Sequence, residues 1–136
     1  MFKKILIPVD LSAAEKGEVM IETAGEVGGK SAELTLINVV EDIPAYVAYE
    51  LPQGILETTR ENAQTQLDDM AGASGRKMAT EVRTGNPATS ILSAAEEIGA
   101  DLIIIASHRP GLQDYLLGST AGRVVRHAKC SVLVLR

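Results

Sequence analysis

The sequence predicts an α/β fold, a single domain over residues 1–136 with an open, doubly wound, five-stranded parallel sheet and helices on both faces. The chain has 136 residues, the usual length of one domain. Its composition, 46% hydrophobic and 23% charged, is typical of a globular protein. Short apolar runs alternate with segments of helical periodicity, which favours a parallel sheet covered on both faces. Right-handed crossovers and short loops then favour double winding.

The first strand is predicted over residues 4–9, an apolar run with Pro8 near its end. Residues 12–15, SAAE, have the sequence of a helix capping box. The helix that follows is predicted to end at the glycine pair 28–29. Its apolar face consists of Ala13, Gly17, Met20, Ala24 and Val27. Residues 32–40 are rich in β-forming residues and predict the second strand.

A long connection, residues 41–54, leads to the second helix. The apolar side of this helix is formed by Ile55, Thr59, Ala63, Leu67 and Met70. The alternation of Met78, Thr80 and Val82 predicts a third strand over residues 77–83.

Asn86 has the side chain of a helix N-cap, and Pro87 suits the first helical position. The helix they begin carries Ile91, Ala94, Ala95 and Ile98 on one face. The fourth strand is predicted over residues 101–107, and a helix begins near Ser119. Residues 131–136, SVLVLR, predict the last strand.

Composition excludes several classes of function. A net charge of −5 without a basic stripe argues against nucleic acid as a partner. No stretch approaches the ~18 apolar residues of a membrane helix, so no membrane partner is expected. The single cysteine excludes an internal disulfide framework, and the expected location is the cytoplasm. Two histidines and one cysteine are too few for a metal-ligand cluster.

Residues 25–31, GEVGGKS, partly resemble a phosphate-binding Walker loop. That motif requires glycine where the chain has Ala24, and it lies between a strand and a helix. Here the order is reversed, because the segment ends a helix and enters a strand. We therefore interpret it as a helix stop.

Two pairs of residues could suggest nucleophilic catalysis. Ser107 and His108 are adjacent in an extended segment, so their side chains point to opposite sides and cannot easily form a nucleophile–base pair. His127 and Cys130 have no evident third group to orient them. Cys130 lies beside an apolar strand and is expected to be a small core residue.

The segment from Ala106 to Thr120 has the strand–loop–helix order of a phosphate cradle. Gly118 and Ser119 lie at the predicted helix start, where backbone amides and the positive end of the dipole face outward. His108 and Arg109 offer further donors. Spacing alone leaves two alternatives open, a phosphate site and a plain helix start.

Asp10 follows the first strand, at the edge of the sheet where ligands of open α/β folds bind. Its carboxylate either accepts hydrogen bonds from ribose hydroxyls or caps the turn into the first helix, and both alternatives stay open. Tyr46 and Tyr49, in the long connection, have three possible roles: covering a base, packing within the loop, or forming a dimer contact.

Four segments resemble the universal stress protein family, in the same order and with similar spacing across the chain. They are KKILIPVDLS, LTLINVVED, EVRTGNPATSILSAAEEIGADLIIIASHR and LLGSTAGRVVRHAKCSVLVLR. The ASHRP…YLLGS…VVRHAKCSVLVLR wording is most similar to the small bacterial F-like branch. The resemblance implies strand order 3-2-1-4-5 and a homodimer, commonly formed by antiparallel pairing of the last strands, here Ser131–Leu135. That edge would otherwise be exposed.

Some members of this family bind ATP and others do not. In the binders, the counterpart of Asp10 contacts the ribose, that of Val39 offers its backbone to adenine, and the loop after the fourth strand surrounds the phosphates. The resemblance thus implies a site for ATP, ADP or AMP, with Mg or Mn carried by the phosphates. Its expected residues are Pro8, Val9, Asp10, Val39, Ala106, Ser107, His108, Arg109, Gly118, Ser119 and Thr120.

The loop departs from the binders' pattern of Gly, two residues, Gly, nine residues, and Gly followed by Ser or Thr. Ala106 replaces the first glycine, Arg109 replaces the second or the second is deleted, and the loop is one residue shorter. The Cβ of Ala106 limits close approach of a phosphate, whereas the planar fork of Arg109 can bind one. Gly118-Ser119 is intact.

The expected function is therefore that of a cytoplasmic stress-response signalling dimer that binds an adenine nucleotide. It is not expected to be an efficient enzyme, with slow ATP hydrolysis or autophosphorylation at most, because phosphoryl transfer needs nucleophile, metal and charge-stabilising groups together. The alternative is an interaction module of the same fold without nucleotide.

Overall fold

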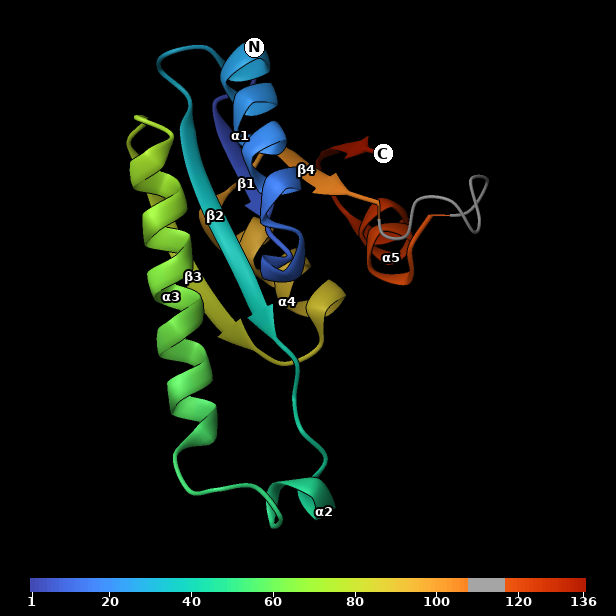
Figure 1. Ribbon diagram of the computed structural model, residues 1–136. Helices are drawn as coiled ribbons and strands as arrows, with labels where there is room; N and C mark the ends of the chain where they lie inside the picture. Colours follow the sequence, from blue (N-terminus) through green and yellow to red (C-terminus); the bar gives the residue numbers. More distant parts are fainter. Residues whose placement is uncertain (108–116) are drawn as a thin grey trace.

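The computed structural model describes residues 1–107 and 117–136 (Figure 1). In this part of the chain lies a five-stranded sheet of order β3-β2-β1-β4-β5. All four strand pairs are parallel. The strands are β1 (Lys4–Pro8), β2 (Glu33–Val40), β3 (Met78–Thr84), β4 (Leu102–Ala106) and β5 (Ser131–Leu135). The predicted strand order and the parallel sheet are confirmed.

Helices cover both faces of the sheet (Figure 1). They are α1 (Ala14–Gly28), α2 (Ala45–Ala48), α3 (Ile55–Ala73), α4 (Pro87–Ile98) and α5 (Ser119–His127), with a 3₁₀ turn, η1 (Leu11–Ala13), before α1. Helices α1 and α3 pack against one apolar cluster, and α4 and α5 pack against another. The sheet separates these two clusters, as double winding requires.

Each central strand supplies side chains to both faces because successive residues point to opposite sides. In β1, Ile5 and Ile7 belong to the α1 and α3 side, whereas Leu6 belongs to the α4 and α5 side. In β4, Ile103 faces α4 and α5, and Ile104 faces the opposite cluster. A strand that is buried on both faces needs an unbroken apolar run, and these two strands have one.

The capping box predicted at residues 12–15 is wrong. The Oδ1 atom of Asp10 accepts hydrogen bonds from the amide of Ser12 at 2.9 Å and from its hydroxyl at 2.6 Å. These bonds stabilise η1, and α1 begins only after it, with Ala13 as an N-cap that makes no side-chain bond. The Ser12 hydroxyl donates to an aspartate two residues earlier, a local contact that competes with helix capping.

The other helix signals are confirmed. Asn86 caps α4 by accepting a 3.0 Å hydrogen bond from the amide of Thr89, and Pro87 is its first residue. Helix α1 ends at Gly28, and the next glycine, Gly29, has φ +77°, a conformation that side chains rarely adopt. Because β2 follows, residues 25–31 form a helix stop.

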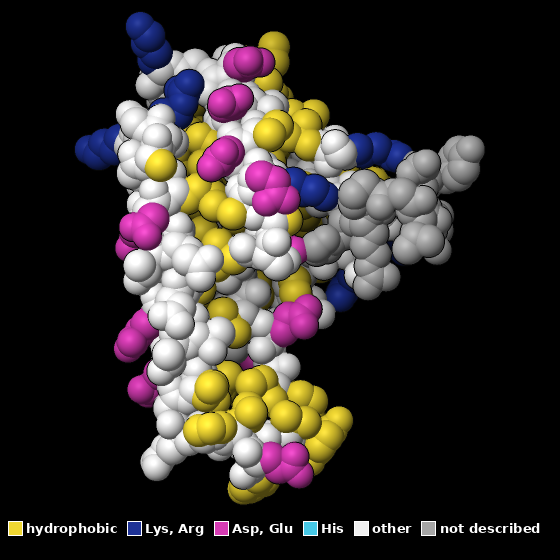
Figure 2. All heavy atoms as spheres, in the orientation of Figure 1, with side chains coloured by type: hydrophobic (Ala, Val, Ile, Leu, Met, Phe, Trp, Pro, Cys, Tyr) yellow, Lys and Arg dark blue, Asp and Glu magenta, His cyan; other side chains and the backbone are white. Residues whose placement is uncertain are grey.

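The connection between β2 and α3 contains the short helix α2, which the sequence analysis did not predict. It extends away from the sheet (Figure 1). Hydrophobic side chains gather over this end of the molecule (Figure 2). Tyr46 and Tyr49, in this connection, are 76% and 92% exposed, so their side chains do not pack within the loop. Over residues 1–107 and 117–136, no helix combines the length and apolar character needed to cross a membrane.

Candidate functional site

A pocket of about 270 Å³ opens at the carboxyl ends of β1 and β4. The two strands are neighbours, but the chain leaves β1 toward α1 on one face of the sheet, and α5 packs on the other face. Such a divergence leaves a crevice at the strand ends. The described lining residues are Pro8, Val9, Asp10, Ala13, Lys16, Met20, Ile37, Asn38, Val39, Glu41, Pro87, Ile91, Ile105, Ala106, Ser107, Gly118, Thr120 and Ala121.

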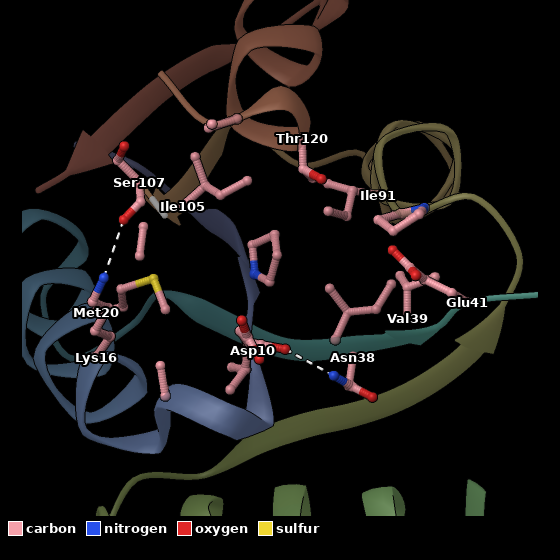
Figure 3. A pocket seen from close by; sticks show the side chains of 18 residues that line it. Asp10, Lys16, Met20, Asn38, Val39, Glu41, Ile91, Ile105, Ser107 and Thr120 are labelled. Carbon is pink, nitrogen blue, oxygen red and sulfur yellow. Dashed lines mark hydrogen bonds between the residues drawn. The ribbon is translucent and has the colours of Figure 1, made fainter. Parts of the chain in front are cut away.

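The end of β1 forms the floor of the pocket with Pro8, Val9 and Asp10. Val9 lies beyond the last residue of β1, but its amide still donates to the Ile37 carbonyl at 2.8 Å. Asp10 caps the turn to Ser12 and also lines the pocket (Figure 3). The structure therefore shows the turn-capping role of this carboxylate and also places Asp10 in the lining of the pocket.

The end of β2 supplies the side chains of Asn38 and Val39, and Glu41 follows immediately. The Asn38 Nδ2 atom donates a 2.9 Å hydrogen bond to the carbonyl oxygen of Val9, which joins the ends of the two strands. Val39 packs against the apolar cluster that contains Ile91 of α4, and both residues line the pocket and make this part of it apolar. This wall suits a flat, largely apolar group.

The end of β4 supplies Ala106 and Ser107. The Nζ atom of Lys16 donates a 3.1 Å hydrogen bond to the Ser107 carbonyl oxygen, so a cation of α1 lies at this end of the pocket (Figure 3). The sequence analysis did not find Lys16. It lies three residues after Ala13 and four before Met20, and this polar residue on the predicted apolar face was the signal that could have revealed it.

The start of α5 reaches the pocket through Gly118 and Thr120. Gly118 is the N-cap residue, and within the described residues no side chain caps this helix end. The first amides of a helix lack intrahelical acceptors, and the dipole there is positive. Ser119 is exposed and is not among the lining residues.

The structure thus brings Pro8, Val9, Asp10, Val39, Ala106, Ser107, Gly118 and Thr120 into one pocket. His108 and Arg109 lie outside the described residues. Tyr46 and Tyr49 are exposed and do not line the pocket. The other lining residues that sequence reasoning missed are mostly apolar, such as Ile37 and Ile105, and along the sequence they cannot be distinguished from core residues.

Charge is distributed unevenly along the pocket. Among its described lining residues, Lys16 is positive and Asp10 and Glu41 are negative. Lys16 lies with Ser107 at one end, and Glu41 lies with Val39 at the opposite end (Figure 3). A ligand with a neutral, flat part and an anionic tail matches this polarity, with the tail toward Lys16.

A second pocket, of about 180 Å³, lies where α4 and α5 end, and Cys130 lines it. Burial raises the pKa of the Cys130 thiol, which keeps it protonated and poorly nucleophilic. Lys129 beside it forms a 2.8 Å ion pair with Glu96. Within residues 1–107 and 117–136, no three His, Cys, Asp or Glu side chains are grouped to hold a metal ion.

The comparisons with known proteins agree on one family. The model of the universal stress protein family matches residues 1–136. The universal stress protein MJ0531 of Methanocaldococcus jannaschii is 36% identical and covers 100% of this chain and 83% of its own length. Universal stress protein G of Salmonella typhimurium is 30% identical, with 100% of both chains covered.

Solved structures show the same fold. The hypothetical protein MJ0577 superposes with a TM-score of 0.79 at 27% identity, covering 99% of this chain and 96% of its own. A universal stress protein in complex with cAMP has a TM-score of 0.66 at 20% identity, covering 99% and 97%. The universal stress protein of Archaeoglobus fulgidus in complex with dAMP has a TM-score of 0.62 at 16% identity, covering 98% of both chains.

Proposed function

The chain belongs to the universal stress protein family, and from this premise we propose that it binds an adenine nucleotide, with ATP as the expected ligand, in the pocket between β1 and β4. One observation carries the proposal: Asp10 and the start of α5 line the same pocket. A carboxylate can accept hydrogen bonds from ribose hydroxyls, and a helix start can bind phosphate. A single pocket could then bind both the ribose and the phosphates of one nucleotide.

The polarity of the pocket supports one orientation of the proposed ligand. The adenine lies against Val39 and Ile91, with the backbone of Val39 as a hydrogen-bonding partner, and the ribose lies over Asp10. The phosphates extend toward Gly118 and the first turn of α5. Since the side chain of Ser119 is exposed, we expect its backbone amide to take part.

Ala106 fits this arrangement even though the family pattern has glycine there. It packs against the apolar cluster under α1 as well as lining the pocket. Several amides must converge to hold a phosphate, because a hydrogen bond to a charged group contributes only about 1.5–3 kcal/mol. The start of α5 offers such amides, and α5 packs on the opposite face of the sheet from the cluster that holds this methyl group.

The relatives support an adenine nucleotide as the ligand class. The universal stress proteins solved with cAMP and with dAMP share the fold of this chain and hold adenine nucleotides. The phosphates of ATP would bring Mg or Mn with them.

We propose a signalling role rather than efficient catalysis. Phosphoryl transfer needs a group that positions the nucleophile, together with metal and charge-stabilising groups. Asp10 is already engaged by Ser12, and Glu41 lies at the end of the pocket away from Lys16. Nucleotide occupancy would then be reported through the surface of a cytoplasmic homodimer, and any hydrolysis or autophosphorylation would be slow.

The dimer is proposed to form through β5, which lies at one edge of the sheet. The residues Val132 to Leu135 are only partly buried although all four are apolar. An edge strand of this kind exposes unpaired backbone groups that a second copy can pair. Antiparallel pairing of two β5 strands would create a continuous sheet across the dimer.

The nucleotide proposal is tested on the purified full chain. Acid extraction followed by chromatography is expected to release an adenine compound, and calorimetry is expected to detect ATP binding. If neither experiment shows an adenine nucleotide at millimolar ligand, the proposal is wrong, and the chain acts as an interaction module of the same fold.

A further inference from the structure

Lys16 lines the pocket, although it is not among the site residues that the family resemblance implies. It lies on the first turn of α1, its side chain is half-buried, and its ammonium is held 3.1 Å from the Ser107 carbonyl oxygen. That carbonyl lies one residue beyond the end of β4, where the crevice opens. The contact therefore fixes a positive charge at one end of the pocket.

The contact with Ser107 leaves the Lys16 ammonium able to donate hydrogen bonds to a further group. An ammonium carries three N–H donors, and the bond to Ser107 uses one of them. A carbonyl partner orients the ammonium without neutralising its charge, in contrast to a carboxylate partner. A half-buried charge also attracts an anion more strongly than a charge in bulk water does.

The other charges of the pocket direct an anion toward this lysine. Asp10 and Glu41, among the described lining residues, are negative, and Glu41 lies at the end opposite to Lys16 (Figure 3). A phosphate group placed near Glu41 would be repelled, whereas near Lys16 it would gain a charge-assisted hydrogen bond. The lysine therefore distinguishes the two ends of the pocket for a charged ligand.

We propose that Lys16 is a phosphate-binding residue of this pocket, positioned by the carbonyl of Ser107, and that it makes affinity depend on the phosphate tail. This inference rests on the proposed nucleotide function and deepens it. Because its charge acts on the phosphates alone, Lys16 favours ATP and adds nothing to the binding of adenosine.

The test is the Lys16→Met variant, which keeps a long, unbranched side chain and removes the ammonium. We expect the Kd for ATP to rise at least about tenfold, the loss of one charge-assisted hydrogen bond. The Kd for adenosine is expected to change less than about twofold. Lys16→Arg is expected to restore most of the ATP affinity, because it restores the positive charge.

Lys30→Met is the matched control, because it removes the same charge from an exposed site outside the pocket. It is expected to leave the ATP affinity unchanged. A second measurement follows ATP affinity against salt concentration, since salt screens the interaction of a charge with the phosphates. Lys16→Met is expected to flatten this dependence, and Lys30→Met is not.

Equal losses for ATP and adenosine would show that Lys16 only holds the end of β4 in place, and would overturn the inference. An unchanged ATP affinity or an unchanged salt dependence in Lys16→Met would also overturn it. In each of these cases the wild-type chain binds ATP, so the proposed function stands. A wild-type chain that binds no adenine nucleotide overturns both.

Discussion

The side-chain amide of Asn38 donates a 2.9 Å hydrogen bond to the carbonyl oxygen of Val9 and so joins the carboxyl ends of β2 and β1. Both residues line the pocket, and Asp10 follows directly. A change at Asn38 is therefore expected to reach the site as well as the stability of the sheet.

Asn38→Leu removes this hydrogen bond while it keeps a similar side-chain volume. We expect the free energy of unfolding to fall by about 1–3 kcal/mol, because the Val9 carbonyl loses its partner in a partly buried place. ATP affinity is expected to fall as well, since the backbone at Val9, directly before Asp10, loses the hydrogen bond that joins it to β2. Urea denaturation and calorimetry measure the two effects. Asn62→Leu, on the exposed side of α3, serves as the control and should change stability by less than about 0.5 kcal/mol.

Gly118→Val is expected to weaken ATP binding without unfolding the chain. Gly118 has φ −58°, which valine adopts without strain, so the effect arises from side-chain atoms in the pocket. Overpacking of about 1–3 kcal/mol corresponds to a rise in Kd of about fivefold to about 150-fold.

Calorimetry on Gly118→Val is compared with that on Gly122→Ala, within α5. The added Cβ of Gly122→Ala would lie 3.9 Å from the Cβ of Leu117, an ordinary contact, and this residue does not line the pocket. The control should therefore bind ATP like the wild type. Wild-type affinity in Gly118→Val would contradict the proposed phosphate position.

Asp101 is expected to make stability depend on acid pH. Its carboxylate accepts hydrogen bonds from the amides of Lys3 and Lys4 at 2.8 and 3.0 Å, and the Lys3 bond is the largest of the causes that lower its pKa below the ordinary 3.8. Because the pKa of this carboxyl is lower in the folded than in the unfolded state, the carboxylate stabilises the fold at pH values above its unfolded-state pKa. This stability is lost as the pH falls through its folded-state pKa.

Asp101→Asn should therefore lower the melting temperature at pH 6 and flatten its decline below pH ~4, where the carboxylate takes up a proton. Thermal unfolding followed by circular dichroism between pH 6 and pH 2.5 measures this change. Asp69→Asn, at an exposed position of α3, is the control. A parallel decline in the wild type and Asp101→Asn would contradict the role of this carboxylate.

Val134→Pro is expected to shift the proposed dimer toward monomer. The Leu135 carbonyl accepts a hydrogen bond from the Ser107 amide, so the backbone of Leu135 faces β4, and that of Val134 faces the open edge by alternation. Proline removes the outward amide at an edge where proline is tolerated.

Val134→Thr keeps both this amide and the β-branched shape, and it should remain dimeric. Sedimentation velocity compares the two variants, and circular dichroism checks that each is folded. If folded Val134→Pro is as dimeric as the wild type, β5 is not the dimer interface.

The double variant Tyr46→Ser/Tyr49→Ser separates the remaining roles of the two exposed tyrosines. Since both side chains are largely exposed, we expect the free energy of unfolding to change by less than about 0.5 kcal/mol. ATP affinity should stay the same, because neither residue lines the pocket. Weaker ATP binding would show that the tyrosines cover the adenine base. A loss of the dimer in sedimentation velocity would show that they form a dimer contact.

Part of the fold could be predicted because its signals are local. The apolar run of β4 and the Asn86-Pro87 start of α4 each specify one element. The capping of α1 was predicted incorrectly because Asp10 and Ser12 offer competing local hydrogen bonds, and the sequence does not rank them. Helix α2 is too short for a periodic pattern.

Some residues of the candidate site could likewise be predicted from the sequence, and others could not. Asp10 and Gly118 could be singled out in the sequence because a carboxylate after a strand and a glycine before a helix lie where α/β folds bind ligands. Lys16 and Glu41 did not stand out, because a charged residue on a helix or in a loop usually faces water. The spacing of Lys16 places it on the predicted apolar face of α1, but its contact with the end of β4 depends on how α1 packs, and the position of Glu41 depends on where β2 ends in the sheet.

The sequence by itself determined the alternation of strands and helices and the burial of the central strands on both faces, since hydrophobic periodicity records which side chains avoid water. The family resemblance already implied that β1 pairs with β4, which places Asp10 and Ser107 at one edge of the sheet. Only the tertiary structure decided that the packing of α1 turns Lys16 toward that edge. The physical reason is that contacts between elements depend on strand order and helix rotation, which are set by the packing of the whole chain.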